Sequence, residues 1–208
     1  SHMLKSKNTE DRISALEALE KIADPAAAGY IVALLTDKDS NIRRLSVNAL
    51  VKIGNTSTLM PLVSVLKKDK DQRQYVWKAI ADILGTSMTK DSKEIEESAV
   101  RELVALLADD YAWAFASSIL GITNYPVTDL LIGALQSSKD KRVRKRIPQT
   151  LASKAQRESE HYSEILSVLC QALQDKDKEV KISAAFALEK LEDLGAIEAL
   201  TRALSDKD

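Results

Sequence analysis

Few side chains in this sequence are of the types that carry out chemistry, and the single cysteine and one histidine come first. Cys170 lies in the apolar segment ILSVLCQAL, with no basic neighbour in sequence to lower the pKa of its thiol. His161 is the only histidine outside the first three residues, and only the carboxylates of Glu158, Glu160 and Glu164 lie near it in sequence. We therefore expect a buried structural thiol and a solvated histidine, with no catalytic or metal-binding residue.

Nucleotide chemistry is not indicated either. The chain contains 6 glycines, and it has no GKS or GKT sequence of the kind that cradles phosphates. We predict no cofactor.

A basic run, KDKRVRKR at 139–146, holds six basic residues and one acidic residue. If Val143 and Ile147 face a helical core, the side chains that project away from it are those of Arg142, Lys145 and Arg146. Such a run is either a solubilising surface or a patch that binds acidic groups or phosphate.

Two tryptophans, Trp77 and Trp113, lie close in sequence to Tyr75, Tyr111 and Phe115. In alanine-rich helices, large aromatic residues pack in cores or grooves. Trp and Tyr also dominate the energetic hot spots of protein interfaces, so both tryptophans are candidate anchors for a partner.

The composition indicates helices throughout. Of the 208 residues, 45% are hydrophobic and 29% are charged, and glycine and proline are rare. The net charge of -1 gives no whole-chain attraction to nucleic acid or to an anionic membrane. The longest apolar run, at 26–35, is too short to span a bilayer.

The elements that would position these side chains come from an internal repeat. The segment at 14–39 aligns with that at 183–208 without a gap, and 12 positions are identical. An acidic-basic turn recurs as DKDSNIR, DKDQRQY, KDKRVRK and DKDKEVK, and the second Asp of each turn lies at Asp39, Asp71, Asp140 and Asp177. A degraded turn, ADDYAWA near Asp109, fills the long gap. Spacings of 31 to 37 residues suit helix pairs.

Each unit reads as two helices. Apolar residues recur at helical spacing after each Asp, as at Ile42, Ala49 and Ile53. We expect Gly54, Gly85 and Gly121 to end three such helices, Asp24-Pro25 to begin one, and Pro148 to delay or kink another; an insertion starts at Thr86. No strand hairpin pattern occurs, so the chain is predicted to be all-α, with about six helix pairs stacked on a continuous core.

The form D-x-x-V-R/K-x-x-A-A-x-A-L, seen at 177–188 and more loosely at 39–50, resembles the HEAT-repeat family, particularly its short-period, phycobilin-lyase-type members. The resemblance implies a right-handed α-solenoid whose concave surface is lined by the helix after each Asp turn. It gives Arg43 and Lys181 a structural role, bonding between repeats. The same helices carry Arg44 and Lys78, which are further candidates for binding.

The predicted function is a non-catalytic interaction scaffold or regulatory module that binds a protein on its concave face, through an acidic segment or a neighbouring domain of the parent chain. The candidate binding residues are Trp77, Trp113, Arg44, Lys78, Arg142, Lys145 and Arg146. The resemblance leaves two alternatives open: a DNA glycosylase-like nucleic-acid binder, using Asp110 or Asp82 beside a tryptophan, and a subunit of a bilin lyase.

The ends of the chain give the predicted domain limits. Residues 1–3 read as an expression-tag scar, and residues 4–208 as one repeat domain. The final DKD opens another unit, and Leu200, Ala203 and Leu204 continue an apolar stripe, so we expect a fragment of a longer array. A single cysteine favours a reducing compartment such as the cytoplasm.

Overall fold

The structure is a computed structural model that describes residues 2–54, 56–84, 90–156 and 160–204. Over these residues the chain consists of helices joined by turns, and no strand occurs among them, which confirms the all-α prediction. Several positions that figured in the sequence predictions lie outside the described residues: Gly85, the first four residues of the insertion (86–89), Glu158, the side chain of Leu204 and the final DKD.

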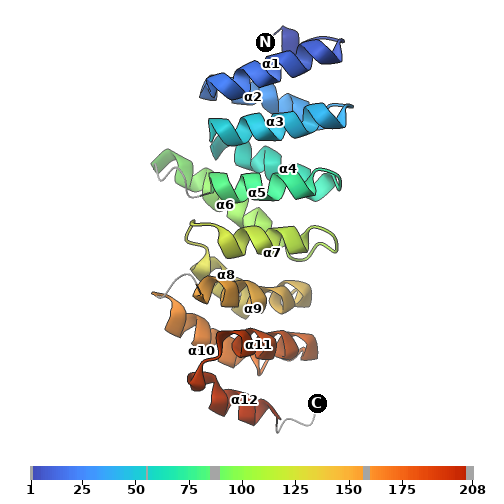
Figure 1. Cartoon of the computed structure of the whole chain (residues 1–208). Coiled ribbons are helices and arrows are strands. Elements are labelled where there is room, and N and C mark those ends of the chain that lie inside the picture. The colour runs from blue at the N-terminus through green and yellow to red at the C-terminus, as the bar shows by residue number, and fades with distance from the viewer. Residues whose placement is uncertain (1, 55, 85–89, 157–159, 205–208) are drawn as a thin grey trace. The chain divides into compact units, whose positions relative to one another are not determined.

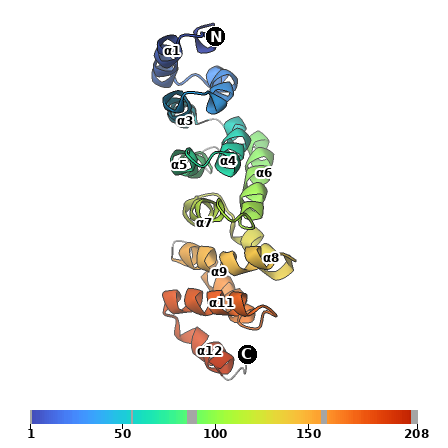
Figure 2. The same cartoon turned by 90° about the vertical axis from the view of Figure 1, so that its right-hand side faces the viewer.

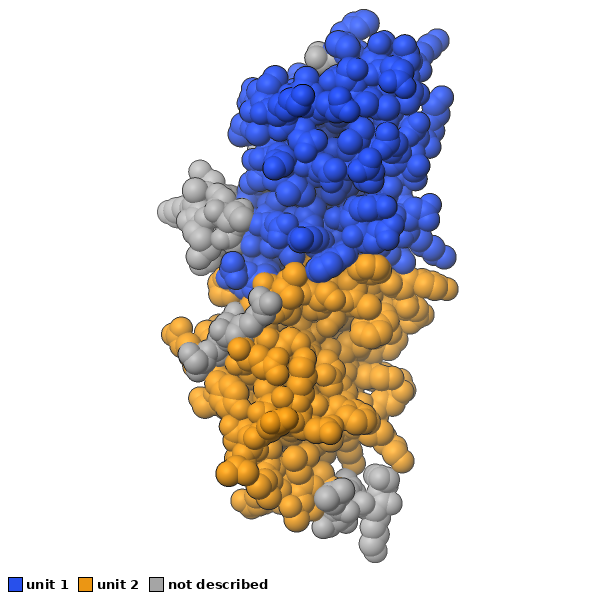
Figure 3. Space-filling model, viewed as in Figure 1, with its two compact units in different colours: residues 1–102, 123–125 blue, residues 103–122, 126–208 orange. Residues whose placement is uncertain are grey.

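The chain divides into two compact units, which Figure 3 colours separately. Unit 1 comprises residues 1–102 and 123–125, and unit 2 comprises residues 103–122 and 126–208. Helix α6 (Lys90–Leu106) contributes residues to both. The prediction of one domain over residues 4–208 stays a prediction.

Unit 1 stacks its helices in two layers (Figures 1 and 2). One layer holds α1 (Thr9–Ile22), α3 (Ser40–Ile53) and α5 (Arg73–Ile83), with α3 in contact with both neighbours. The other holds α2 (Ala28–Val32) and α4 (Leu59–Lys68), which pack on α3 and α5 respectively. The helix after each Asp turn therefore belongs to one layer.

Unit 2 repeats this arrangement (Figures 1 and 2). Helix α9 (Lys141–Ala155) packs between α7 (Trp113–Ile122) and α11 (Lys178–Leu191). Behind them, α8 (Thr128–Ser137) packs on α9, and α10 (Tyr162–Ala172) packs on α8, α9 and α11. Helix α12 (Ile197–Leu204) follows a short 3-10 turn, Leu194–Ala196. Other 3-10 turns, of three or four residues, lead into α1, α2, α3 and α4.

Side-chain caps start the helices where the repeat predicts. The side chain of Asp39 accepts hydrogen bonds from the backbone N–H groups of Asn41 and Ile42. Asp24, which directly precedes Pro25, accepts one from the N–H group of Ala26. The turn near Asp109, predicted as degraded, is also capped: this carboxylate accepts the N–H groups of Tyr111 and Ala112. Each cap satisfies donors that a helix start leaves free.

In the second of the turns the first Asp is the cap, because Asp69 accepts the N–H groups of Asp71 and Gln72. Two local predictions need correction. Gly54 ends α3 with φ +62°, as predicted, but Gly121 lies inside α7, which continues to Ile122. An added Cβ at Gly121 would lie 3.5 Å from the Cβ of Ser153, which is an ordinary contact distance.

Pro148 does not delay its helix. Helix α9 begins at Lys141, capped by Asp140, and runs through Pro148 to Ala155. The proline lacks an N–H, so the carbonyl of Arg144 has no helical donor at that position. Packing offsets this loss, because Val143, Ile147 and Leu151 are all buried.

Candidate functional site: a groove between α7, α9 and α11

Arginines at a constant spacing from the capping residues stabilise the turns between helices. We call the fourth residue after each capping residue the ladder position. Arginine occupies it after Asn8, Asp39, Asp69 and Asp140, as Arg12, Arg43, Arg73 and Arg144. Each guanidinium donates to the carbonyl six residues earlier, which belongs to Ser6, Asp37, Lys67 and Ser138 respectively. The distances are 2.8 to 2.9 Å, so these arginines close their own turns.

The ladder arginines also join successive repeats. Arg12 pairs with Asp37 at 3.1 Å, and Arg144 pairs with Asp175 at 2.8 Å with its side chain only 5% exposed. Burial acts to raise the pKa of Asp175, but hydrogen bonds from Arg144 and from a backbone N–H outweigh it, and the pKa lies below its usual value. In the turns at Asp37 and Asp175 the first Asp therefore holds the preceding repeat and the second caps its own helix. Asp69 does both, because it pairs with Arg43 and also caps its own turn.

Helix α7 breaks this pattern with a tryptophan. Trp113 is the fourth residue after the capping Asp109, so it stands at the ladder position, and no guanidinium from α7 itself is available there. The carbonyl six residues earlier belongs to Leu107, a fully buried residue. Arg146, from α9, donates to this carbonyl and to that of Asp109, at 2.8 Å for the second. One arginine of the next repeat thus supplies the bond that is missing from α7.

The same guanidinium lies over the indole. The central carbon of the Arg146 guanidinium is 4.7 Å from the centroid of the Trp113 ring, within the range of a cation–π contact. Burial lowers the pKa of Arg146, and the nearby carboxylate of Asp110 acts in the opposite direction. Arginine still stays charged at neutral pH. Its side chain is 15% exposed, whereas Trp113 remains 38% exposed.

A groove of about 370 Å³ opens beside this pair. Trp113 and Ser117 of α7 line it, together with Lys145, Arg146 and Gln149 of α9 and Glu179, Ile182, Ser183 and Phe186 of α11. Ile182 is 46% exposed and Phe186 is 59% exposed. Two large apolar side chains of α11 therefore share one hollow with a tryptophan of α7, a composition typical of a protein-binding surface.

The charges around the groove are paired with one another. Lys145 bonds Glu179 at 2.7 Å, and Arg142 bonds Asp140 at 2.9 Å. Asp110, which is 68% exposed, lies 3.7 Å from Arg142 and 3.8 Å from Arg146. These carboxylates neutralise the positive charge of the basic run. The groove therefore presents an apolar surface, and the charged side chains at its rim form exposed ion pairs with one another.

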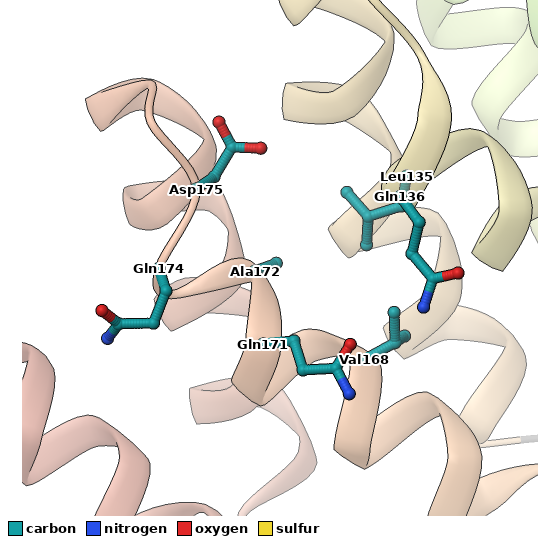
Figure 4. A pocket seen from close by; sticks show the side chains of 7 residues that line it. All are labelled: Leu135, Gln136, Val168, Gln171, Ala172, Gln174 and Asp175. Carbon is teal, nitrogen blue, oxygen red and sulfur yellow. The ribbon is translucent and has the colours of Figure 1, made fainter.

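A second hollow lies on the opposite layer of unit 2, with a volume of about 190 Å³ (Figure 4). Leu135 and Val168 form apolar parts of its wall, and the side chains at its edge are those of Gln136, Gln171, Gln174 and Asp175. Asp175 is already engaged by Arg144. This hollow therefore offers neutral amides and no free charge among its described lining residues.

The remaining predicted binding residues lie in unit 1. Trp77 is partly exposed in α5, beside the exposed Lys78. Arg44 of α3 donates to the side chain of Asn41 at 2.8 Å. Unit 2 brings together Trp113, Lys145 and Arg146, with Arg142 close by at the rim.

The residues considered for chemistry occupy ordinary positions. Cys170 is partly buried, and burial, followed by the charge of Asp193, raises the pKa of its thiol, so it is a poor nucleophile. His161 precedes α10 and is partly exposed. Asp82 is exposed on α5, in unit 1, and Asp110 is held by the two arginines of α9. Among the described residues, no group of three or more His, Cys, Asp or Glu side chains could hold a metal ion.

Two kinds of residue in the turns and the groove were not predicted from the sequence. Ile182 and Phe186 fill unspecified positions of the repeat motif, and only their exposure reveals them. Arg12, Arg73 and Arg144 were not recognised as equivalents of Arg43, although their fixed spacing from a capping residue was a usable signal. Within the described residues, no helix is both long and apolar enough to cross a membrane.

Comparison with known proteins identifies the repeats. A family model of HEAT repeats matches residues 1–81 and 128–208. The uncharacterized phycocyanin operon protein Z of Pseudanabaena tenuis (strain PCC 7409) is 27% identical over 195 residues, covering 91% of this chain and 92% of that protein.

Solved structures give weaker likenesses. An engineered protein is 23% identical with a TM-score of 0.44, covering 100% of this chain and 63% of that one, so this chain spans less than two thirds of its length. A designed armadillo repeat protein in complex with the peptide (KR)4 is 19% identical with a TM-score of 0.45, covering 92% of this chain and 97% of that one.

Proposed function

Because this chain belongs to the HEAT-repeat family, we propose that it is a non-catalytic protein-interaction module that binds a partner segment in the groove between α7, α9 and α11. The observation that carries the proposal is the gathering of Trp113, Ile182 and Phe186, each 38% to 59% exposed, in one hollow. Aromatic anchors in a partly desolvated pocket supply most of the energy at protein interfaces.

The basic residues play a secondary part. Arg142 and Lys145 are candidate contacts for acidic groups of the partner, which would replace Asp110 and Glu179 in their present ion pairs. Exchange of one exposed ion pair for another changes affinity little and mainly affects association rate and register. In unit 1, Trp77 is a second candidate anchor, with Arg44 and Lys78 as candidate polar contacts.

Peptide selection tests the proposal. A phage-displayed library of random peptides is selected on the whole chain, and the dissociation constants of the selected peptides are measured by fluorescence anisotropy. Trp113→Ala and Phe186→Ala are expected to weaken binding about tenfold or more, as loss of hot-spot residues does. Tyr30→Ala, which removes an exposed aromatic residue of unit 1, is the matched control. Peptides that bind all four proteins equally would refute the proposal.

A second candidate function is that of a bilin lyase subunit. The resemblance to phycocyanin operon protein Z extends over nearly the whole of both chains. The groove also combines aromatic surface with Lys145 and Arg146, a combination suited to a flat conjugated molecule bearing carboxylates. Mixing the chain with a bilin and an apo-phycobiliprotein tests this candidate. A bilin-dependent absorbance change that requires the chain supports it, and its absence counts against it.

A further inference from the structure

We propose that Arg146 is the positioning residue of the groove: it replaces the ladder arginine that α7 lacks and thereby holds the Trp113 indole as an exposed anchor for the partner. The role of that anchor rests on the proposed function. The replacement itself rests only on the hydrogen bonds of Arg146 and on the arginine pattern of the repeats.

The hydrogen bonds identify the replacement. Four ladder arginines donate to the carbonyl six residues before them. At Trp113 that carbonyl is the one of Leu107, and its donor is Arg146. A ladder arginine stands four residues after its cap, but Arg146 stands six residues after Asp140, and Arg144 already occupies the ladder position of α9. Helix α9 therefore carries a second, additional arginine that serves the turn before it.

The arrangement frees a surface position for binding. A ladder arginine binds a carbonyl of its own turn and is therefore not available at the surface, as the low exposure of the Arg12 and Arg144 side chains shows. With the turn closed from α9, position 113 can carry a large aromatic ring on the surface while Leu107 keeps a donor for its buried carbonyl. The stacked guanidinium then restricts the ring to one orientation beside Phe186 and Ile182.

The mechanism makes Arg146 unlike its neighbour Arg142. The guanidinium of Arg142 pairs with the carboxylates of Asp110 and Asp140 and is 48% exposed, so it serves as the matched control in the same helix. The Nη1 of Arg146 donates to two backbone carbonyls while its planar guanidinium lies over the indole, a combination that lysine and glutamine do not offer. Substitution of Arg146 should therefore disturb both the turn and the indole, whereas substitution of Arg142 should disturb neither.

A double-mutant cycle tests the replacement in the full chain. Arg146→Gln is expected to lower the midpoint of thermal unfolding by about 3 to 6 °C, since it leaves a buried carbonyl without a donor. Trp113→Arg restores the ladder arginine within α7. In that background Arg146→Gln should therefore lower the midpoint of thermal unfolding much less than it does in the original chain. Equal losses in both backgrounds would overturn the replacement. Arg142→Gln should leave the midpoint unchanged in either.

Fluorescence tests the positioning of the ring. In a Trp77→Phe background Trp113 is the only tryptophan. Arg146→Lys keeps the charge but removes the stacked fork, and it is expected to increase the quenching of Trp113 by acrylamide and to shift its emission, while Arg142→Lys does neither. Unchanged emission and quenching in Arg146→Lys would show that this arginine does not position the ring.

Binding separates this inference from the proposed function. For a phage-selected peptide whose binding Trp113→Ala weakens, Arg146→Lys should raise the dissociation constant about tenfold, and Arg142→Lys should leave it nearly unchanged. If no selected peptide depends on Trp113, the proposed function fails, and the unfolding cycle and the fluorescence still decide the role of Arg146. If peptides depend on Trp113 but not on Arg146, the inference fails and the proposed function stands.

Discussion

The guanidinium of Arg146 stacks at 4.7 Å over the indole of Trp113 and at the same time closes the turn that this tryptophan cannot close. One contact therefore connects the folding of the repeat with the exposed aromatic surface of the groove. It also means that a charge-reversal experiment on the basic run must leave Arg146 intact. Arg142→Glu with Lys145→Glu tests attraction to acidic groups without breaking a turn.

Removal of a ladder arginine should be costly. Arg144→Ala removes the guanidinium that donates to Asp175 and to the carbonyl of Ser138, and the free energy of unfolding should fall by about 2 kcal/mol. Urea denaturation followed by circular dichroism measures this loss. An unchanged midpoint would show that the ladder arginines do not stabilise the turns.

The same ion pair predicts acid sensitivity. Because the pKa of Asp175 is lower in the folded chain than in an unfolded one, its ionised form stabilises the fold above its unfolded value of about 4, and this stabilisation is lost as pH falls through the lower, folded value. Asp175→Asn should remove that part of the pH dependence. Thermal unfolding of both proteins between pH 6 and pH 2.5, roughly spanning these values, measures it. Parallel curves would contradict the prediction.

Two glycines should respond in opposite directions to alanine. Gly54 ends α3 at φ +62°, so Gly54→Ala should destabilise the chain by about 1 kcal/mol. Gly133 lies within α8 with open space where a Cβ would be, so Gly133→Ala should stabilise it by about 0.5 to 1 kcal/mol. Denaturant midpoints decide both, and the same sign for the two variants would be inconsistent with this backbone geometry.

Binding in the groove should depend weakly on salt. The basic side chains around it are paired with Asp110, Asp140 and Glu179, so few ions are released when a partner binds. A selected peptide should lose less than about threefold in affinity between 50 and 200 mM salt. A nucleic-acid ligand that made several phosphate contacts would lose roughly a thousandfold or more over the same range. A steep slope with either ligand would favour the nucleic-acid alternative.

The fold could be predicted from sequence because helix periodicity and capping residues are local signals. The helix after Asp39 and the hidden turn at Asp109 are examples. The cap at Asp69 was not identified, because the motif itself does not distinguish Asp69 from Asp71. The uninterrupted helix around Pro148 was not predicted, because the packing of its buried side chains offsets the lost hydrogen bond. A repeated motif locates a helix more reliably than it locates the residue that begins it.

The candidate site could be predicted only in part. Trp113 was singled out as an aromatic residue, and Lys145 and Arg146 as basic residues, but nothing in the sequence indicated that Arg146 lies on the tryptophan. Helical spacing predicts that the side chain of Arg146 points away from the core of its own helix pair. It does not predict which residue of another helix that side chain contacts. The contribution of α11 depends on tertiary packing across a spacing of about one repeat, which periodicity does not reveal.

The groove should be separable from the fold. Phe186 is 59% exposed, so Phe186→Ala should shift the unfolding midpoint little, as exposed substitutions do. A large loss of stability would instead make it a core residue.

The most direct test of the account is the dissociation constant of a peptide selected on the whole chain, measured for the original chain and for Phe186→Ala, Trp113→Ala and Tyr30→Ala. The account predicts that the two groove variants weaken binding about tenfold or more while Tyr30→Ala leaves it unchanged. Equal affinity for all four proteins would contradict it, because the exposed side chains of α7 and α11 would then not form the binding surface.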